Sequence, residues 1–279
     1  MWLMCRLLTV SPSAYYAYVK GGKSLKVLDR QRLKAKVNEI YWFHRRRYGA
    51  RRISDELKDR GLRASRHRVS SLMREQGLRA IQPRSFVPKT TRSINHLASP
   101  NLLKEAAPTA PGQAIVGDIT YLPLVNGKWC YMATWQDKIS KKVVGWKISD
   151  RMTDELVIEA LRKALMRGPV KHGAIIHSDR GSQYSSCNFR KLLKLHGLRQ
   201  SMSGKGNCYD NAQAESFFAR FKIELVEGGT FCSVDDARSE AFSYIEGYYN
   251  RVRKHSALGY LSPEQFERRF EDQQLRKAA

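Results

Sequence analysis

The sequence has no long apolar run and few cysteines. No stretch approaches the roughly 18 consecutive apolar residues of a membrane-spanning helix, so we expect no membrane partner. The five cysteines are scattered, and none forms a Cys-x-x-Cys pair: Cys5, Cys130, Cys187, Cys208 and Cys232. A zinc or disulfide framework is therefore not expected, and the reducing cytoplasm is the compartment that the sequence favours.

Acidic residues are scarce relative to basic ones. The chain has 50 Lys and Arg against 26 Asp and Glu, a net charge of +24. Residues 1–110 contain 24 of the basic residues and only 7 of the acidic ones. This asymmetry predicts a basic, nucleic-acid-binding first region joined to a more balanced enzymatic core. An anionic membrane surface and ribosomal RNA are the alternative partners for such charge, but the three acidic residues described below argue against both.

The first region shows helical patterns. Residues 3–19 predict two short helices that are broken near Val10. Three more helices are predicted over residues 31–48, 51–60 and 66–76, the last with Ser65 as its N-cap. A helix, a short glycine turn and a capped basic helix are typical of a helix-turn-helix, for which we expect DNA contacts from Arg66, Arg68, Arg51 and Arg52. The alternative is a three-helix bundle with a solvated basic face.

The remaining chain alternates between strand and helix patterns. Strands are predicted over residues 115–124, 129–135, 142–148, 174–177 and 198–202. Helices are predicted over residues 153–165 and 187–196, from residue 211, over residues 234–249 and from Pro263, where Ser262 and Gln265 form a capping box. Three antiparallel strands followed by helix–strand units predict an α/β fold with a mixed sheet.

Three acidic residues stand where such a fold keeps its chemistry. Asp118 and Asp179 end apolar strand patterns, and Glu215 lies early in a predicted helix. Strand ends deliver side chains to one edge of an open sheet, so the three acids are expected to meet there. Carboxylates are the ligands of hard cations such as Mg²⁺ or Mn²⁺, and a metal pair stabilises both oxygens of a phosphoryl displacement. Each acid taken alone is equally consistent with an ordinary strand-end or helix-start residue.

Residues around the third acid complete the candidate site. Lys222 follows Glu215 by seven residues, close to two helical turns, so the two share a helix face. Lys205 and Asn207 lie in a glycine-rich loop and are candidates for DNA contact. We expect Gln213 to cap the helix reciprocally with Asp210. His177, two residues before Asp179, is either a structural histidine or a site residue.

Several of these motifs together resemble a known family. They are His177-Ser-Asp-Arg-Gly-Ser-Gln-Tyr184, Asp210-Asn-Ala, Glu215-Ser-Phe-Phe218, Tyr249-Asn250, His255 and Leu258-Gly-Tyr-x-Ser-Pro263. The sequence is similar to the second-frame transposases of insertion sequence family three, which have a retroviral-integrase-type core. The resemblance implies a ribonuclease H-like, five-stranded mixed sheet with flanking helices, preceded by a small helix-turn-helix domain.

The resemblance also implies a reaction and its cofactors. It predicts a DDE transposase, a divalent-metal-dependent polynucleotidyl transferase that cleaves and joins DNA strands to integrate an insertion sequence. By this likeness Asp118 bridges two Mg²⁺ or Mn²⁺ ions per active site, while Asp179 and Glu215 each bind one. A ribonuclease or resolvase on the same fold is a related alternative. A decayed or domesticated transposase that binds DNA as a repressor without catalysis is the alternative from another class.

Domain limits and partners follow from the same reading. We predict an N-terminal helical arm (residues 1–30), a helix-turn-helix-like DNA-binding domain (31–81), a proline-containing linker (82–112) and an integrase-type catalytic core with C-terminal helices (113–272). The expected partner is double-stranded DNA, as element ends and as target, bound by a homo-oligomer. An upstream-frame helix-turn-helix partner or fusion is also implied, in a bacterial cytoplasm on the nucleoid.

Overall fold

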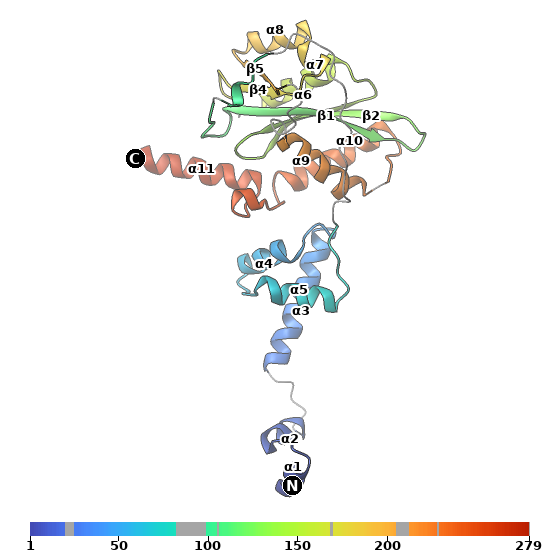
Figure 1. The fold of residues 1–279 in the computed structure, drawn as a ribbon, viewed down its shortest axis with the longest axis vertical. Helices are drawn as coiled ribbons and strands as arrows, with labels where there is room; N and C mark the ends of the chain where they lie inside the picture. The colour runs from blue at the N-terminus through green and yellow to red at the C-terminus, as the bar shows by residue number, and fades with distance from the viewer. Residues whose placement is uncertain are drawn as a thin grey trace. The chain divides into compact units, whose positions relative to one another are not determined.

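The computed structural model describes residues 1–19, 25–81, 99–104, 106–167, 170–204, 212–227 and 229–278. Contacts divide the chain into two units, Met1–Ile81 and Gln82–Ala279. We call them the N-terminal unit and the core unit, and each is described by itself (Figure 1).

The N-terminal unit is entirely helical. The two predicted short helices are α1 (Trp2–Leu7) and α2 (Pro12–Val19), and the other three are α3 (Leu25–Phe43), α4 (Ala50–Asp59) and α5 (Arg66–Glu75). Helix α3 ends earlier than predicted because Arg45 and Arg46 take left-handed φ values of 48° and 64°. The predicted cap is confirmed, since the Ser65 side chain accepts a hydrogen bond from the Arg68 N–H. Helices α3, α4 and α5 share a buried apolar core: Val37, Ile40, Ile53, Leu57, Val69 and Leu72.

The core unit is built on one mixed sheet. Its strands are β1 (Ala114–Pro123), β2 (Trp129–Asp137), β3 (Val143–Ser149), β4 (Ile175–Ser178) and β5 (Arg199–Met202). The spatial order is β3-β2-β1-β4-β5. Strand β2 is antiparallel to β1 and β3, whereas β1, β4 and β5 run parallel. The predicted five-stranded mixed sheet is thereby confirmed.

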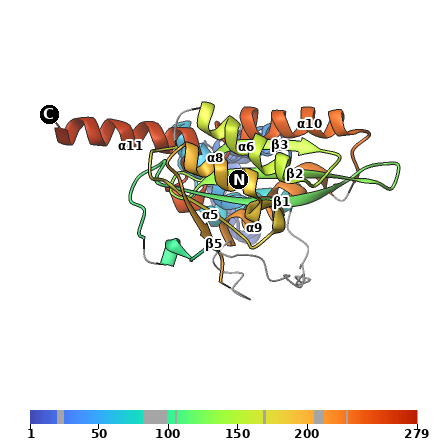
Figure 2. The ribbon, with the colours of Figure 1, turned by 90° about the horizontal axis from the view of Figure 1, so that it is seen from above.

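Helices cover both faces of this sheet (Figures 1 and 2). One face packs against α6 (Asp154–Met166), α7 (Ser182–Ser185) and α8 (Cys187–Leu195), around Trp135. The other face packs against α9 (Ala212–Phe221) and α10 (Val234–Phe242), around Met132. Trp135 and Met132 lie three residues apart on β2 and therefore point to opposite faces. This arrangement is the expected ribonuclease H-like fold class.

The C-terminal helices depart from the predicted periodicity. A π-helical turn, η3 (Lys222–Val226), follows α9, and a longer one, η4 (Ser243–Tyr249), follows α10. After the short η5 (Ser256–Leu258), helix α11 (Pro263–Ala278) runs away from the sheet (Figure 2). Its predicted capping box is confirmed: the Ser262 N–H donates to Gln265 Oε1 at 2.9 Å, and the Gln265 N–H donates to Ser262 Oγ at 3.3 Å. No helix in the described ranges is long and apolar enough to cross a membrane.

The residues before β1 pack against β5, which is an edge strand of the sheet. The short helix η1 (Leu102–Lys104) begins where the Leu102 N–H donates to Ser201 Oγ at 2.9 Å. The Met202 N–H donates to the Pro100 carbonyl at 3.3 Å. The final part of the predicted linker therefore lies against β5, while residues 82–98 fall outside the described residues.

Close packing of α6 on β3 depends on Gly145. A Cβ atom there would overlap the Ala160 carbonyl and lie 2.9 Å from the Ala164 Cβ. We expect Gly145→Ala to lower the free energy of unfolding by about 1–3 kcal/mol, because the helix backbone cannot yield without shifting. Urea unfolding of the full chain measures this. Gly247→Ala is the control, since its Cβ would meet no described heavy atom within 4 Å. Equal effects of the two substitutions would contradict this account.

Candidate active site

Parallel pairing of two strands brings two of the predicted acids to one edge. In the β1–β4 pair, Val116 lies opposite His177. Asp118 and Asp179 each follow their member of this pair by two residues. Neighbouring strands lie about 4.8 Å apart, so the two carboxylates emerge side by side at the carboxyl end of β4.

Backbone hydrogen bonds orient both carboxylates. Asp118 Oδ1 accepts the Ile119 N–H at 2.8 Å, and Asp179 Oδ1 accepts the Gly181 N–H at 3.0 Å. Asp118 is half-buried on the same strand face as Leu122, which packs in the cluster that contains α9. Asp179 lies beyond the end of its strand and is exposed. Both acids therefore keep oxygen atoms available toward the α9 side of the sheet.

Helix α9 supplies the third acid. Its apolar stripe, Ala214, Phe217, Phe218 and Phe221, is buried. Glu215 lies just outside this stripe and is exposed. Helix α9 contacts β1, and its buried stripe faces the sheet. Because this stripe fixes the rotation of the helix, it also sets the direction in which Glu215 points.

The three acids influence one another electrostatically. Loss of hydration raises the pKa of Asp118 to about 8, and the charges of Asp179 and Glu215 contribute to this rise. Loss of hydration also raises the pKa of Glu215, with a further contribution from Asp179, and it raises the pKa of Asp179. The arrangement thus holds three carboxyl groups where full ionisation is unfavourable without a compensating cation.

Lys222 is the cation within electrostatic reach of this cluster. Loss of hydration lowers its pKa, and the charge of Asp118 opposes that shift. Lys222 in turn lowers the pKa of Asp118. Lys222 is the first residue of the π-helical turn η3, directly after α9.

The donor set fits a hard divalent cation. Three carboxylates with raised pKa values are the oxygen ligands that Mg²⁺ and Mn²⁺ accept, and such ions keep several waters as further ligands. No group of three His, Cys, Asp or Glu side chains in the described part of the chain is already gathered closely enough to enclose an ion. The fit therefore rests on the chemistry of Asp118, Asp179 and Glu215 and on their mutual repulsion.

Gln213, the predicted reciprocal partner of Asp210, bonds to the sheet. Its amide nitrogen donates to Gln136 Oε1 at 3.0 Å and to the Asp137 carbonyl at 2.8 Å, and its oxygen accepts from Lys141 at 2.8 Å. These partners, on and beside β2, tie the start of α9 to the sheet. The predicted positions Lys205, Asn207 and Asp210 lie outside the described residues.

His177 is a buried brace between strands. Its side chain is fully buried, with Nδ1 2.8 Å from Ser201 Oγ and Nε2 3.2 Å from Ser203 Oγ. Of the two roles considered for it, the structure supports the structural one, since both ring nitrogens bond to β5 and the residue after it.

The predicted DNA contacts of the N-terminal unit differ in exposure. Arg66 and Arg51 are exposed. Arg68 is half-buried and pairs with Asp29 at 2.6 Å. Arg52 is also half-buried, with its guanidinium 5.5 Å from the Tyr48 ring centroid.

Sequence reasoning missed a buried ion pair at the end of the third-acid helix. Glu224 and Arg253 are 2.6 Å apart, and their side chains are 7% and 1% exposed. A signal was present, because Glu224 follows Phe221 by three residues and so continues the apolar stripe of α9. A carboxylate at such a position requires a buried partner.

Comparison with known proteins places these features in a family. A family model described as HTH-like domain matches residues 28–86. Two models described as integrase core domain match residues 108–208 and 196–263. Among solved structures, the chain resembles one in a simian T-cell lymphotropic virus intasome bound to PP2A regulatory subunit B56 gamma, with 16% identity, a TM-score of 0.48 and coverage of 83% of this chain and 74% of that one. It also resembles the HTLV-2 integrase catalytic core domain in complex with magnesium, with 13% identity, a TM-score of 0.44 and coverage of 57% and 97%.

Sequence relatives carry the assignment. The chain is 41% identical over 269 residues to the transposase InsF for insertion sequence IS3A of Escherichia coli strain K12, covering 95% of this chain and 92% of that transposase. It is 40% identical over 268 residues to the insertion element IS600 uncharacterized 31 kDa protein of Shigella sonnei, covering 96% and 98%. With an HTH-like domain followed by an integrase core, this chain belongs to the family of transposases of insertion sequence IS3.

Proposed function

We propose that this DNA transposase cleaves and joins DNA strands with Asp118, Asp179 and Glu215 as its catalytic carboxylates. The observation that carries the proposal is the parallel register of β1 and β4, which puts Asp118 and Asp179 side by side on the face of the sheet that α9 covers. Burial raises the pKa of Asp118 to about 8, and the charges of Asp179 and Glu215 add to this rise. Perturbed carboxyl groups that converge from separate elements are a signature of a functional site. The polynucleotidyl transferase activity of the family supplies the reaction that such a site performs.

The three carboxylates would hold Mg²⁺ or Mn²⁺, two ions per active site. Asp118 would hold these ions together with Asp179 and Glu215, because its strand β1 pairs with β4 and also contacts α9. Ions bound there would activate the attacking oxygen and stabilise the leaving 3′ oxygen. The backbone N–H groups of Ile119 and Gly181 keep Asp118 and Asp179 aimed at this place before any ion binds.

Basic residues of both units would bind the DNA substrate. Lys222 would contact a phosphate beside the carboxylates, joined by Lys205 and Asn207 from the preceding glycine-rich loop. In the N-terminal unit, α5 would bind the element end through Arg66 and Arg68, with Arg51 and Arg52 on flanking phosphates. The partner is double-stranded DNA, bound by a homo-oligomer on the bacterial nucleoid in the cytoplasm, alone or with an upstream-frame helix-turn-helix protein.

Removing a single carboxylate charge tests the site. Asp118→Asn, Asp179→Asn and Glu215→Gln should each lower strand joining by at least about 100-fold, because each removes a metal ligand while preserving side-chain size. Joining of labelled element ends in Mg²⁺ or Mn²⁺ measures the effect. Asp150→Asn is the matched control, since Asp150 is an exposed acid that directly follows β3.

End binding should persist in all four proteins, as measured by fluorescence anisotropy. Wild-type joining by any of the three acid variants would reject that acid's assignment. If the wild-type protein binds ends but joins none in either metal, the chain is instead a DNA-binding repressor derived from a transposase.

The raised pKa of Asp118 predicts a pH-dependent stability. Its pKa rises from 3.8 to about 8 on folding, so ionisation destabilises the metal-free folded state progressively between these values. Asp118→Asn should therefore stabilise the metal-free protein by about 1–3 kcal/mol at pH 8.5 and far less at pH 5. Thermal unfolding in EDTA at both pH values measures this. An equal difference at the two pH values would contradict the assigned cause.

DNA binding by α5 predicts a salt dependence. Arg66→Ala should weaken end binding and reduce the slope of log affinity against log salt by roughly one, because one phosphate contact is lost. Arg68→Ala should act similarly, although Arg68 must also leave Asp29. Arg162→Ala, which removes an exposed arginine of α6, serves as the control. If the Arg66 variant keeps the wild-type affinity and salt slope, α5 does not bind DNA through Arg66 and serves only as a packing helix.

A further inference from the structure

A buried carboxylate lies at the end of the helix that carries Glu215. Glu224 continues the apolar stripe of α9, where an unpaired charge would cost several kcal/mol. Arg253 meets it in a two-pronged contact: Arg253 Nε lies 2.9 Å from Oε2 and Nη2 lies 2.6 Å from Oε1. The planar fork of arginine fixes both the distance and the direction of such a contact.

Two tyrosines complete this pair. The Tyr244 hydroxyl donates to Glu224 Oε2 at 2.9 Å. The Tyr249 ring centroid lies 5.7 Å from the Arg253 guanidinium carbon. Both tyrosines are buried, so water does not compete for the carboxylate from their side. Glu224 is therefore held in one place by three donor atoms of Arg253 and Tyr244.

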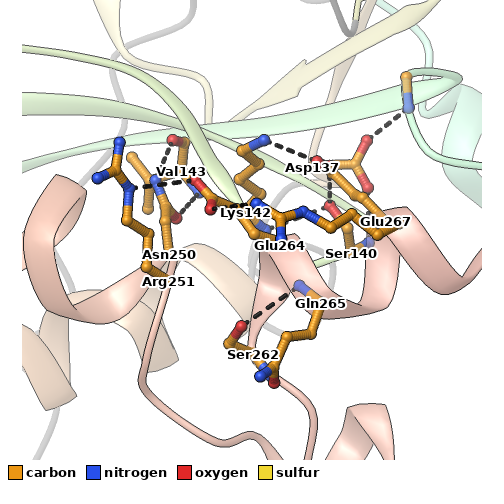
Figure 3. A network of polar contacts seen from close by, with 12 residues as sticks. Asp137, Ser140, Lys142, Val143, Asn250, Arg251, Ser262, Glu264, Gln265 and Glu267 are labelled. Carbon is orange, nitrogen blue, oxygen red and sulfur yellow. Dashed lines mark hydrogen bonds and ion pairs between the residues drawn. The ribbon is translucent and has the colours of Figure 1, made fainter.

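The segment that carries Arg253 is itself fastened to the sheet. The Asn250 amide exchanges two hydrogen bonds of 3.0 Å with the N–H and carbonyl of Val143 on β3 (Figure 3). Gln136 on β2 donates to the Tyr249 hydroxyl at 2.8 Å. The position of Arg253 is thus set by two strands and not by its own loop alone.

The start of α9 is also fastened to β2. Gln213, two residues before Glu215, bonds to Gln136 Oε1 and to the Asp137 carbonyl. Gln136 also pairs with Val116 in the β1–β2 ladder. Val116 precedes Asp118 by two residues, so one glutamine links the start of α9 to the strand that carries the first acid.

We infer that Arg253 is a positioning residue that sets Glu215 and Lys222 against Asp118, by fixing the end of α9 through Glu224. Gln213 fixes the start of the same helix, and Glu215 lies between the two attachments. The inference rests on the proposed function, since it assigns a role relative to the carboxylates proposed there. It also gives Tyr249 and Asn250, which are among the motifs quoted from the sequence, a common purpose with Arg253.

The Glu224–Arg253 pair orients the end of α9 more than it stabilises the folded protein. A buried ion pair contributes little net stability compared with apolar residues of the same volume. Glu224 lies in the π-helical turn η3, which closes with the Glu227 N–H on the Lys222 carbonyl at 3.0 Å. Such wide turns are frequent at functional sites. Holding Glu224 therefore also fixes the turn that starts at Lys222.

Arg253→Lys in the full chain is the first test, because it keeps the charge and removes the fork. We expect the joining rate and the Mn²⁺ affinity each to fall by about 10–100-fold, as for other residues that orient metal ligands. Mn²⁺ affinity is measured by titration calorimetry without DNA, and raised Mn²⁺ should partly restore joining. End binding and the near-ultraviolet circular dichroism should match the wild type. Arg251→Lys is the matched control, because the Arg251 side chain is 65% exposed and its contact with Glu264 is long, at 3.6 Å.

Tyr244→Phe is the second test and decides the matter if Arg253→Lys does not fold. It removes one hydrogen bond to Glu224 and leaves the ring in place, so a smaller fall in both quantities is expected. Wild-type joining and Mn²⁺ affinity in a folded Arg253→Lys protein, or in Tyr244→Phe if the first is unfolded, would overturn the inference. Glu215→Gln separates the two claims. If Glu215→Gln loses joining and Mn²⁺ affinity while the Arg253 variant keeps both, only the positioning role of Arg253 is rejected. If Glu215→Gln keeps both, the proposed site itself is rejected.

Discussion

Parallel pairing of β1 with β4 is the constraint on which the arrangement of the site depends. It puts Asp118 and Asp179 at equal distances past the Val116–His177 pair, and no other pairing of these strands would do so. His177 holds the next strand in place through Ser201 and Ser203. The third acid, Glu215, lies on helix α9 and not on a strand, so the packing of α9 against the sheet has to align it separately.

Much of this molecule follows from local patterns in the sequence. The apolar run before Asp179 predicts the end of β4, and serine caps predict the starts of α5 and α11, because these signals depend on neighbouring residues alone. Asp118, expected to end an apolar strand, instead lies within β1, because pairing with β2 continues the strand to Pro123. The π-helical turns were not predictable, since periodicity does not distinguish them from α-helix over a few residues. The Glu224–Arg253 pair was also missed, because its members are 29 residues apart and no local pattern names the partner.

Part of the positive charge of the N-terminal unit is already paired with acidic side chains. Arg68 pairs with Asp29, while Arg30 and Lys34 both contact Glu75. Exposed pairs of this kind stabilise a protein by at most about 1 kcal/mol each, so a phosphate can replace the acidic partner at little cost.

The dependence of α9 on Arg253 gives the chain an order of assembly. All three carboxylates are synthesised before Arg253, which is 38 residues beyond Glu215 in the sequence. A polypeptide still emerging from the ribosome, or one cut short before this arginine, therefore has every acid of the site but nothing to pair with Glu224. If the proposed roles hold, such a molecule would bind DNA without joining strands, so activity would require Arg253 as well as the three acids.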